Sequence, residues 1–299
     1  MGASLLICGI LPLLAVVDTR VFLVFALFTF GIGVGVSDYV SNSLSIVIER
    51  ESGRPLISGF HGLYSVGGIV GSGGVSALLI AGRSPLFSTL CAAIFIILIL
   101  SWIFNKICSR PVAREKLRLA MPPPIIFILG ALCFIVFLAE GSTLDWSGVY
   151  LTSVRGMDPS YSGLGFAAFA SMMIAGRLNG DRLVRHVREA NIIMLGGLIA
   201  GGGLTLTMLT PDRRAWIAGY ALVGFGCSNI VPLLYRAIGR QDFPESLAVP
   251  IVSTMGYSGV LMGPAAIGLI SSLSSLTVAF LVVEVLLVAT ALVGRIIRI

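Results

Sequence analysis

The chain consists mainly of apolar runs that are long enough to cross a bilayer as helices. A membrane helix needs about 20 predominantly apolar residues, and runs of that order recur here between charged or Pro/Gly-rich breaks. In lipid, each such run must satisfy its own backbone hydrogen bonds, which favours helix. We predict about ten helices, at residues 3–17, 21–48, 56–81, 85–105, 124–152, 159–179, 190–210, 214–235, 245–270 and 276–297.

The composition excludes a soluble domain. Hydrophobic residues make up 57% of the 299 residues and charged residues only 11%, whereas soluble domains carry about 25% charged residues. The mean hydropathy is +1.01. The alternating apolar and polar pattern of an outer-membrane strand is absent, which excludes a barrel. The fold class that we predict is an all-α, polytopic membrane bundle in contact with the lipid bilayer.

Positive charge alternates between the loops. With both termini in the cytoplasm, fifteen of the 20 Lys and Arg residues fall on the inside and five on the outside. Cytoplasmic loops of membrane proteins carry such an excess. We therefore expect a multi-pass protein with both termini cytoplasmic, and we interpret the net charge of +6 as topology rather than as a signal for nucleic acid.

The longest polar link divides the chain into two halves. It carries five basic residues and ends in three consecutive prolines, where no helix can continue. We predict an N-terminal half at 1–106 with four helices, a cytoplasmic linker at 107–123, and a C-terminal half at 124–299 with six helices.

The two halves share a weak internal similarity. Each contains a glycine-rich helix, a short charged turn, and a helix with a G-x-x-x-G pattern, at Gly67–Gly71 and Gly259–Gly263. The offset is near 192 residues and brings Asp38 beside Asn229. Weak internal repeats of this kind are typical of transporters built from parallel repeats.

These features resemble the major facilitator superfamily. The segment GRLNGDRLVR, residues 176–185, is similar to the basic G-x-x-x-D-R loop of that superfamily. The segments SDYVSN, ERESGRPLISGFHGLYSVGG and AEGSTLDWSGVYL resemble its bacterial, fucose-permease-like branch. The resemblance implies a secondary transporter in the bacterial inner membrane that binds a small polar, sugar-like solute near the midplane and works by alternating access.

The resemblance also implies that two helices are missing at the front. If residues 176–185 are the second-half copy of the basic loop, the four helices before the linker correspond to the third to sixth helices of a first half. The chain is then expected to lack the first two helices and the first copy of the loop. A non-transporting truncated paralogue or gene fragment is therefore one alternative, and a drug or metabolite efflux member of the superfamily is another.

Asp38 and Asn42 lie four residues apart on one face of the second predicted helix. A carboxylate at membrane depth costs roughly 2.5–3.5 kcal/mol on insertion scales, so it needs a partner, a wet cavity or a function. The resemblance implies that Asp38 couples proton binding to substrate binding. The structural alternative is a buried carboxylate bonded to Asn42 or to a backbone amide, and Asn42 either binds a substrate hydroxyl or holds Asp38.

Two further residues are candidates for substrate or proton binding. Glu140 ends an apolar run near Asp145 and Trp146, and a carboxylate beside an indole suits a sugar ring. For Trp146 we favour the alternative of an interfacial aromatic residue. Asn229 is expected to be the second-half cavity residue that corresponds to Asp38.

A basic cluster is the candidate for a cytoplasmic gate. The charges in the segment 176–185 are spaced to brace neighbouring helix ends, and the resemblance implies gating of the inward face rather than substrate binding. The alternative is a topology signal alone. The residues concerned are Gly176, Arg177, Asp181, Arg182 and Arg185.

Other functional classes find little support. The GYSG segment at residues 256–259 resembles the short motif of rhomboid proteases, but both histidines precede it, and no metalloprotease or nucleotide-binding motif is present. The five cysteines stand singly with no CxxC, so we expect neither disulfides nor a metal site. We expect a monomer without a cofactor whose partners are a small-molecule substrate, protons and the bilayer, and no enzyme activity.

Overall fold

A computed structural model describes residues 1–107 and 121–296 of the chain, and every described element is helical. The first four helices are α1 (Gly2–Leu14), α2 (Arg20–Ser52), α3 (Ile57–Ile80) and α4 (Pro85–Ile107). After the proline triplet come α5 (Pro124–Val149), the π-helical segment η1 (Tyr150–Val154), the 3₁₀ turn η2 (Pro159–Tyr161), α6 (Leu164–Val184), α7 (Glu189–Leu209), α8 (Arg213–Cys227), α9 (Ile230–Ile238), α10 (Glu245–Leu273) and α11 (Leu276–Ile296). The prediction of an all-α polytopic bundle is confirmed.

Eight of the described spans are long and apolar enough to cross a membrane. The two other predicted spans correspond to α1 and α6. The helix α1 has only 13 residues, and the last two turns of α6 carry charged and amide side chains that lower its hydropathy. α8 and α9 together form one span, as do α5 and η1, so each predicted helix has a counterpart.

The chain divides into two compact units. Unit 1 consists of Met1–Leu44 and Tyr64–Leu119, within which only residues up to 107 are described, and unit 2 consists of Ser45–Leu63 and Ala120–Ile299. The last two turns of α2 and the first two of α3 therefore belong to unit 2. Most of the predicted linker at 107–123 lies outside the described residues, and the boundaries of the halves stay a prediction.

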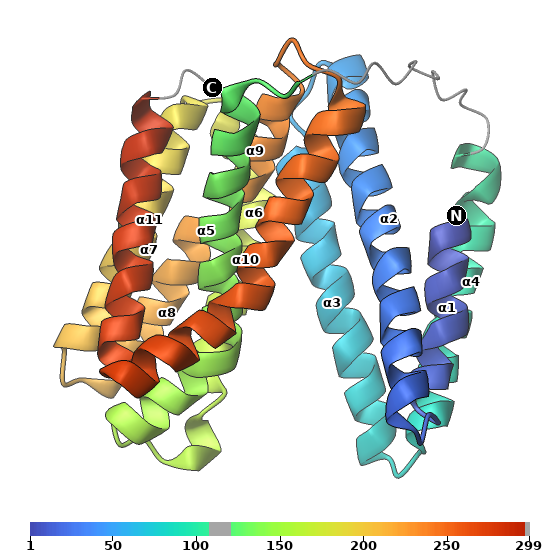
Figure 1. Cartoon of the computed structure of the whole chain (residues 1–299), viewed down its shortest axis with the longest axis horizontal. Helices are drawn as coiled ribbons and strands as arrows, with labels where there is room; N and C mark the ends of the chain where they lie inside the picture. Colours follow the sequence, from blue (N-terminus) through green and yellow to red (C-terminus); the bar gives the residue numbers. More distant parts are fainter. Residues whose placement is uncertain (108–120, 297–299) are drawn as a thin grey trace. The chain divides into compact units, whose positions relative to one another are not determined.

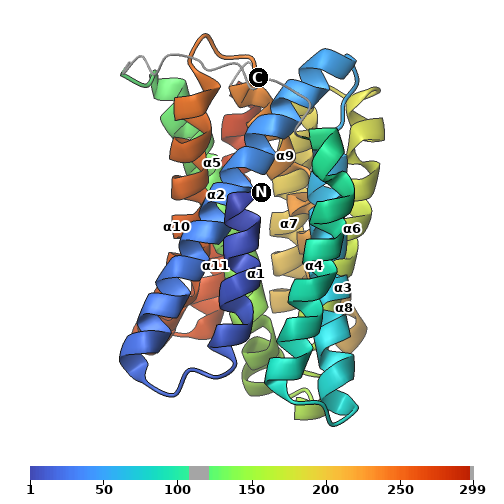
Figure 2. The same ribbon diagram turned by 90° about the vertical axis from the view of Figure 1, so that its right-hand side faces the viewer.

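In unit 1, α1 packs along α4, and the two helices run side by side in Figures 1 and 2. α1 also meets α2 at Gly33, where an added Cβ would lie 2.8 Å from the Ile7 side chain. Cys8 and Pro12 are the buried residues of α1. This unit is thus held by apolar packing of short side chains.

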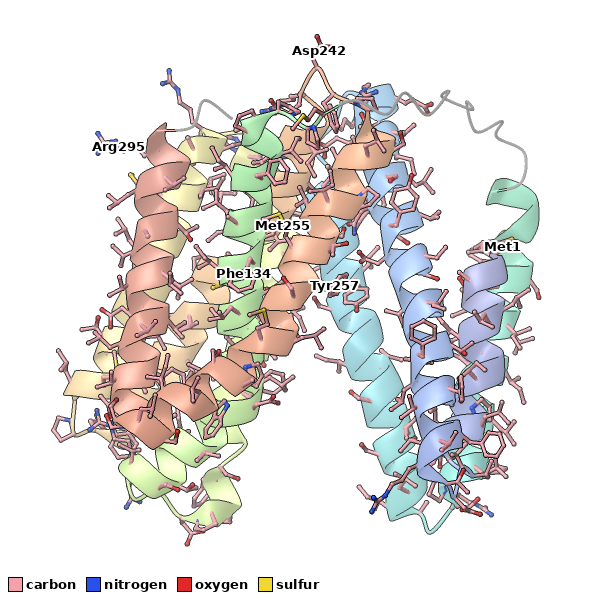
Figure 3. All side chains as sticks on the ribbon, viewed as in Figure 1. Met1, Phe134, Asp242, Met255, Tyr257 and Arg295 are labelled. Atoms are coloured by element: carbon pink, nitrogen blue, oxygen red, sulfur yellow. The ribbon has the colours of Figure 1, made fainter. Side chains whose placement is uncertain are left out.

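In unit 2, α5 and α10 form the most extensive helix pair, and α11 packs against both of them and against α7 (Figure 1). Phe134 and Met255 lie on these two helices in Figure 3. Gly259 on α10 lies against the carbonyl oxygen of Phe134, and an added Cβ at Gly263 would lie 2.9 Å from the carbonyl oxygen of Leu138. Small residues allow such close backbone approach where lipid provides no hydrophobic driving force between helices.

The α5–α10 contact gives a first prediction. We expect Gly259→Ala to destabilise the protein by roughly 1–3 kcal/mol, because the new methyl group would collide with the backbone of α5 rather than with a mobile side chain. Thermal unfolding in detergent measures this effect. The matched control is Gly202→Ala on α7, where nothing lies within 4 Å of an added Cβ. Equal melting temperatures of the two variants would contradict the packing argument.

Candidate functional site

A proline interrupts the span that α8 and α9 share. Pro232 has no N–H, so the carbonyl of Ser228, four residues earlier, receives no hydrogen bond within the helix. The helix breaks at Ser228 and Asn229. The freed Ser228 carbonyl accepts a hydrogen bond of 3.4 Å from Nε of Arg177 on α6. The break therefore creates a polar site inside a membrane span, which is typical of transporter binding regions.

The same arginine pairs with Glu140. Nη2 of Arg177 donates to Oε1 of Glu140 on α5 at 3.1 Å, and the side chains are only 8% and 20% exposed. Glu140 lies near the middle of the 31-residue span Pro124–Val154, and thus deep in it. Removal of one partner from a buried ion pair leaves an uncompensated charge, so the two charges depend on each other.

Asn229 occupies the break itself. Its Nδ2 donates to the carbonyl oxygen of Gly176 at 2.9 Å and to Oγ of Ser228 at 3.0 Å. Its Oδ1 is buried and accepts no hydrogen bond within the described residues, and it lies directly against Gly180 on α6. We refer to Glu140, Arg177, Ser228 and Asn229 as the interior site.

In unit 1, Asp38 and Asn42 are in contact. Nδ2 of Asn42 donates to Oδ2 of Asp38 at 2.9 Å, one turn apart on α2. Asn42 is 6% exposed. The hydrogen bond that the structural alternative requires is therefore present, and it also fits a carboxylate that is held ready to bind a proton or a solute hydroxyl.

Two carboxylates cap the start of α3. Oε2 of Glu49 accepts from the backbone N–H groups of Leu56, at 2.6 Å, and Ile57, at 3.0 Å. Asp181 of α6 accepts from the next two, Ser58 at 3.1 Å and Gly59 at 2.7 Å. The first four N–H groups of a helix have no partner within it, and here acids from two other helices satisfy all four. Negative charge is favourable at this helix end.

Arg236 joins these acids to a third one. From α9 it donates to both oxygens of Glu49, with Nη2 at 2.7 Å from Oε2, and lies 3.5 Å from both Asp181 and Glu189. Arg240 also pairs with Glu189, at 2.7 Å. We call Glu49, Asp181, Glu189, Arg236 and Arg240 the helix-end cluster. Arg236 is 5% exposed, so its charge depends on these acids.

The predicted gating segment is distributed over three environments. Arg177 belongs to the interior site and the carbonyl of Gly176 accepts a hydrogen bond from Asn229 of that site, whereas Asp181 belongs to the helix-end cluster. Arg182 and Arg185 are exposed and form no ion pair within the part of the chain that the structure describes. The segment is mostly the end of α6, which runs to Val184, rather than a loop, and two of its charged side chains, Arg177 and Asp181, have partners on other helices.

Several members of these clusters were not predicted from the sequence. Arg236 and Arg240 counted only among the inside charges, and no site role was predicted for Glu49 or Glu189. The partner of Arg236, Glu49, lies 187 residues away in the chain. A signal for Ser228 was available, because Pro232 stands inside a predicted span. Trp146 donates from Nε1 to the carbonyl of Pro264 at 3.0 Å, so its indole is used in packing against α10.

Comparison with known proteins identifies the family. The sequence profile of the Major Facilitator Superfamily matches residues 1–248. An uncharacterised MFS-type transporter of Yersinia pestis is 44% identical over 295 residues, which are 98% of this chain and 77% of the relative. The membrane protein MosC of Rhizobium meliloti is 31% identical over 255 residues, 81% of this chain and 60% of that protein.

A solved structure supports the same fold. A bacterial homologue of the iron transporter ferroportin, crystallised in an outward-facing state, superposes with a TM-score of 0.67 at 13% identity, and the alignment covers 99% of this chain and 81% of the homologue. At this identity the likeness concerns the fold alone. With the family profile and the relatives, it establishes a multi-pass membrane protein of a transporter family. The chain belongs to the Major Facilitator Superfamily.

Proposed function

We propose that the chain is a secondary active transporter that takes up a small polar, sugar-like solute together with protons. It works by alternating access in the bacterial inner membrane, with both termini in the cytoplasm. The observation that carries this proposal is the buried ion pair between Glu140 and Arg177 beside the break at Ser228. Ionisable residues inside a membrane span are rare and mark solute or proton pathways.

Proton binding at Glu140 changes the net charge of the interior site. A proton on Glu140 removes the negative charge that faces Arg177, and the guanidinium then keeps the neutral carbonyl of Ser228 as a partner. The free energy of the site therefore differs between the two protonation states. A transporter that changes conformation with protonation needs such a difference, because a ligand shifts an equilibrium only through its differential affinity for the two states.

We expect the protein to recognise its solute through one neutral and one acidic hydrogen-bond acceptor. Oδ1 of Asn229 accepts no hydrogen bond among the described residues, and the Asp38 carboxylate, which accepts a hydrogen bond from Asn42, is an acceptor by its chemistry. These groups suit hydroxyl hydrogens of a sugar-like molecule. Asp38, Asn42, Glu140 and Asn229 remain the proposed substrate- and proton-binding residues.

The helix-end cluster is proposed to act as a gate. It attaches the turn between α2 and α3 to α6 and α9 through charge-assisted hydrogen bonds, which contribute about 1.5–3 kcal/mol each. Alternating access requires contacts of this kind to break and form again in each cycle. Asp181 is the residue of the predicted gating segment that belongs to the helix-end cluster.

The first functional prediction concerns Glu140. A monosaccharide screen first identifies the hexose that the wild-type protein transports. In proteoliposomes with an imposed pH gradient, we expect Glu140→Gln to lose uphill accumulation of this hexose. Counterflow exchange of the same hexose remains, because the amide still accepts from Arg177 but binds no proton. The matched control is Glu284→Gln on α11, an acid that accepts a 2.5 Å hydrogen bond from Thr205. Wild-type accumulation by Glu140→Gln would refute the proposal.

Asp38 gives a separate prediction. We expect Asp38→Asn to keep exchange and to lose pH-driven accumulation, since the amide retains a hydrogen bond with Asn42 but does not titrate. The exposed Asp18 at the start of α2 serves as the control through Asp18→Asn. Unchanged pH-driven accumulation in the Asp38 variant would assign proton coupling to another carboxylate.

The gate is tested by the accessibility of Ser58, which is 0% exposed beside Asp181. In a background without the five native cysteines, we expect Asp181→Asn to raise the rate at which Ser58→Cys reacts with a thiol reagent about tenfold. Loss of charge-assisted hydrogen bonds of the size given above shifts a two-state equilibrium by at least this factor.

The control for the gate is Glu245→Gln. Glu245 pairs with Arg50, which is 59% exposed, and such surface pairs contribute about 0–1 kcal/mol. We expect a change of less than about threefold in the labelling rate. Equal labelling rates in the Asp181 and Glu245 variants would argue against a gate centred on Asp181.

A further inference from the structure

A hollow of about 520 Å³ lies in unit 2 where α5 ends and α6 begins. Its size falls within the range of small-molecule sites in proteins, about 300–1,000 Å³. One face comes from α5 and η1, and the other from η2 and the start of α6. The residues used below are Asp145, Ser147, Thr152, Ser153, Ser162 and Phe166.

The hollow lies at a boundary of the membrane rather than at its centre. Its lining includes Pro159, Ser162 and Gly163 of the connection between α5 and α6, and this connection lies at the end of the α5 span opposite Pro124. Asp145 and Ser153 of the lining are exposed, so the hollow is open to a solute from this end.

Two of its polar groups have no protein partner. The hydroxyl of Ser147 is buried, in a residue that is 1% exposed, and makes no hydrogen bond with the described residues. A buried hydroxyl without a partner costs about 1–3 kcal/mol. The exposed carboxylate of Asp145 also forms no hydrogen bond or ion pair within residues 1–107 and 121–296. The exposed carboxylate of Asp145 is thus available to a ligand, whereas the hydroxyl of Ser147 is buried and not open to the hollow.

The neighbouring acid Asp158 differs from Asp145, because its carboxylate has hydrogen-bond partners within the protein. Its Oδ1 accepts from both the backbone N–H and the hydroxyl of Ser160, and these hydrogen bonds hold the pKa of the Asp158 carboxyl below its usual range. This acid caps η2 and does not line the hollow. Asp158 therefore has a structural role as a helix cap, whereas Asp145 has no such role.

The lining favours a neutral, hydroxyl-rich ligand. Besides one carboxylate it has the hydroxyl groups of Thr152, Ser153 and Ser162, and no basic side chain, which disfavours an anion. Hydroxyl groups both donate and accept, whereas the carboxylate accepts only. Phe166 provides an apolar face for C–H groups. An organic cation would require more aromatic faces than this single ring for cation–π binding.

We propose that this Asp145 hollow is a binding site for a neutral polyhydroxylated solute of hexose size, which it holds at the membrane boundary. The carboxylate of Asp145 accepts two hydroxyl hydrogens of the solute. The assignment of the solute class rests on the proposed transport function. Occupancy of the hollow is an equilibrium property that does not require coupled transport.

The test is site-specific protection from a thiol reagent. Ser153 is exposed and lines the hollow, whereas Ser160 is exposed and does not. In the background without native cysteines, we expect glucose or mannitol to slow the labelling of Ser153→Cys in a saturable way and to leave that of Ser160→Cys unchanged. Choline chloride, as a small organic cation, serves as the competing probe.

A further variant assigns the protection to the proposed carboxylate. We expect Asp145→Asn to weaken protection of Ser153→Cys about tenfold, the effect of one lost charge-assisted hydrogen bond. The matched control is Asp212→Asn, which changes an exposed acid that caps α8 outside the hollow. It should leave protection unchanged.

Each outcome decides between explanations. No protection by either polyol, protection unaffected by Asp145→Asn, or protection by choline alone would overturn the proposed site or its ligand class. A failure of Glu140→Gln to uncouple transport would refute the proposed coupling without touching this site. Conversely, transport of a hexose with no protection at Ser153 would retain the transport function and refute the hollow.

Discussion

The structure depends on one constraint, which is that a polar group inside a membrane span must find a partner in the protein. Pro232 frees the carbonyl of Ser228, Arg177 donates to it, and Glu140 neutralises Arg177. Each step makes the next one necessary, because an unpaired charge in this environment costs several kcal/mol. A single missing N–H on α9 is thus linked to an acid on α5. The interior site is the end of this chain of requirements rather than an isolated ion pair.

The helix α6 connects this site with the helix-end cluster. Arg177 and Asp181 are four residues apart and therefore lie on the same face of α6, one turn from each other. Gly180 between them lies against Asn229 on one side, and an added Cβ there would lie 2.7 Å from the Ser58 side chain. A displacement of α6 after protonation of Glu140 would thus act directly on the carboxylate that caps α3. Under the proposed function, this helix transmits the state of the interior site to the gate.

The sequence predicted the membrane spans well and the charged clusters poorly. Hydropathy is a local property, so spans such as 276–297 for α11 (Leu276–Ile296) were predicted nearly residue for residue. The cap of α3 by Asp181 joins residues 122 or more positions apart, and no local pattern encodes such a pairing. Arg177 shows the same difficulty. Its charge favoured a loop, but its partners Glu140 and Ser228 allow it inside a helix.

The segment η1 ends the span that begins with α5. A π-helical turn accommodates one residue more than an α-helical turn, and here the N–H of Arg155 donates to the carbonyl of Tyr150, five residues earlier. Thr152 and Ser153 belong to this wider turn and line the hollow together with Ser162 and Phe166. The last turn of the span therefore forms part of the wall that faces the start of α6.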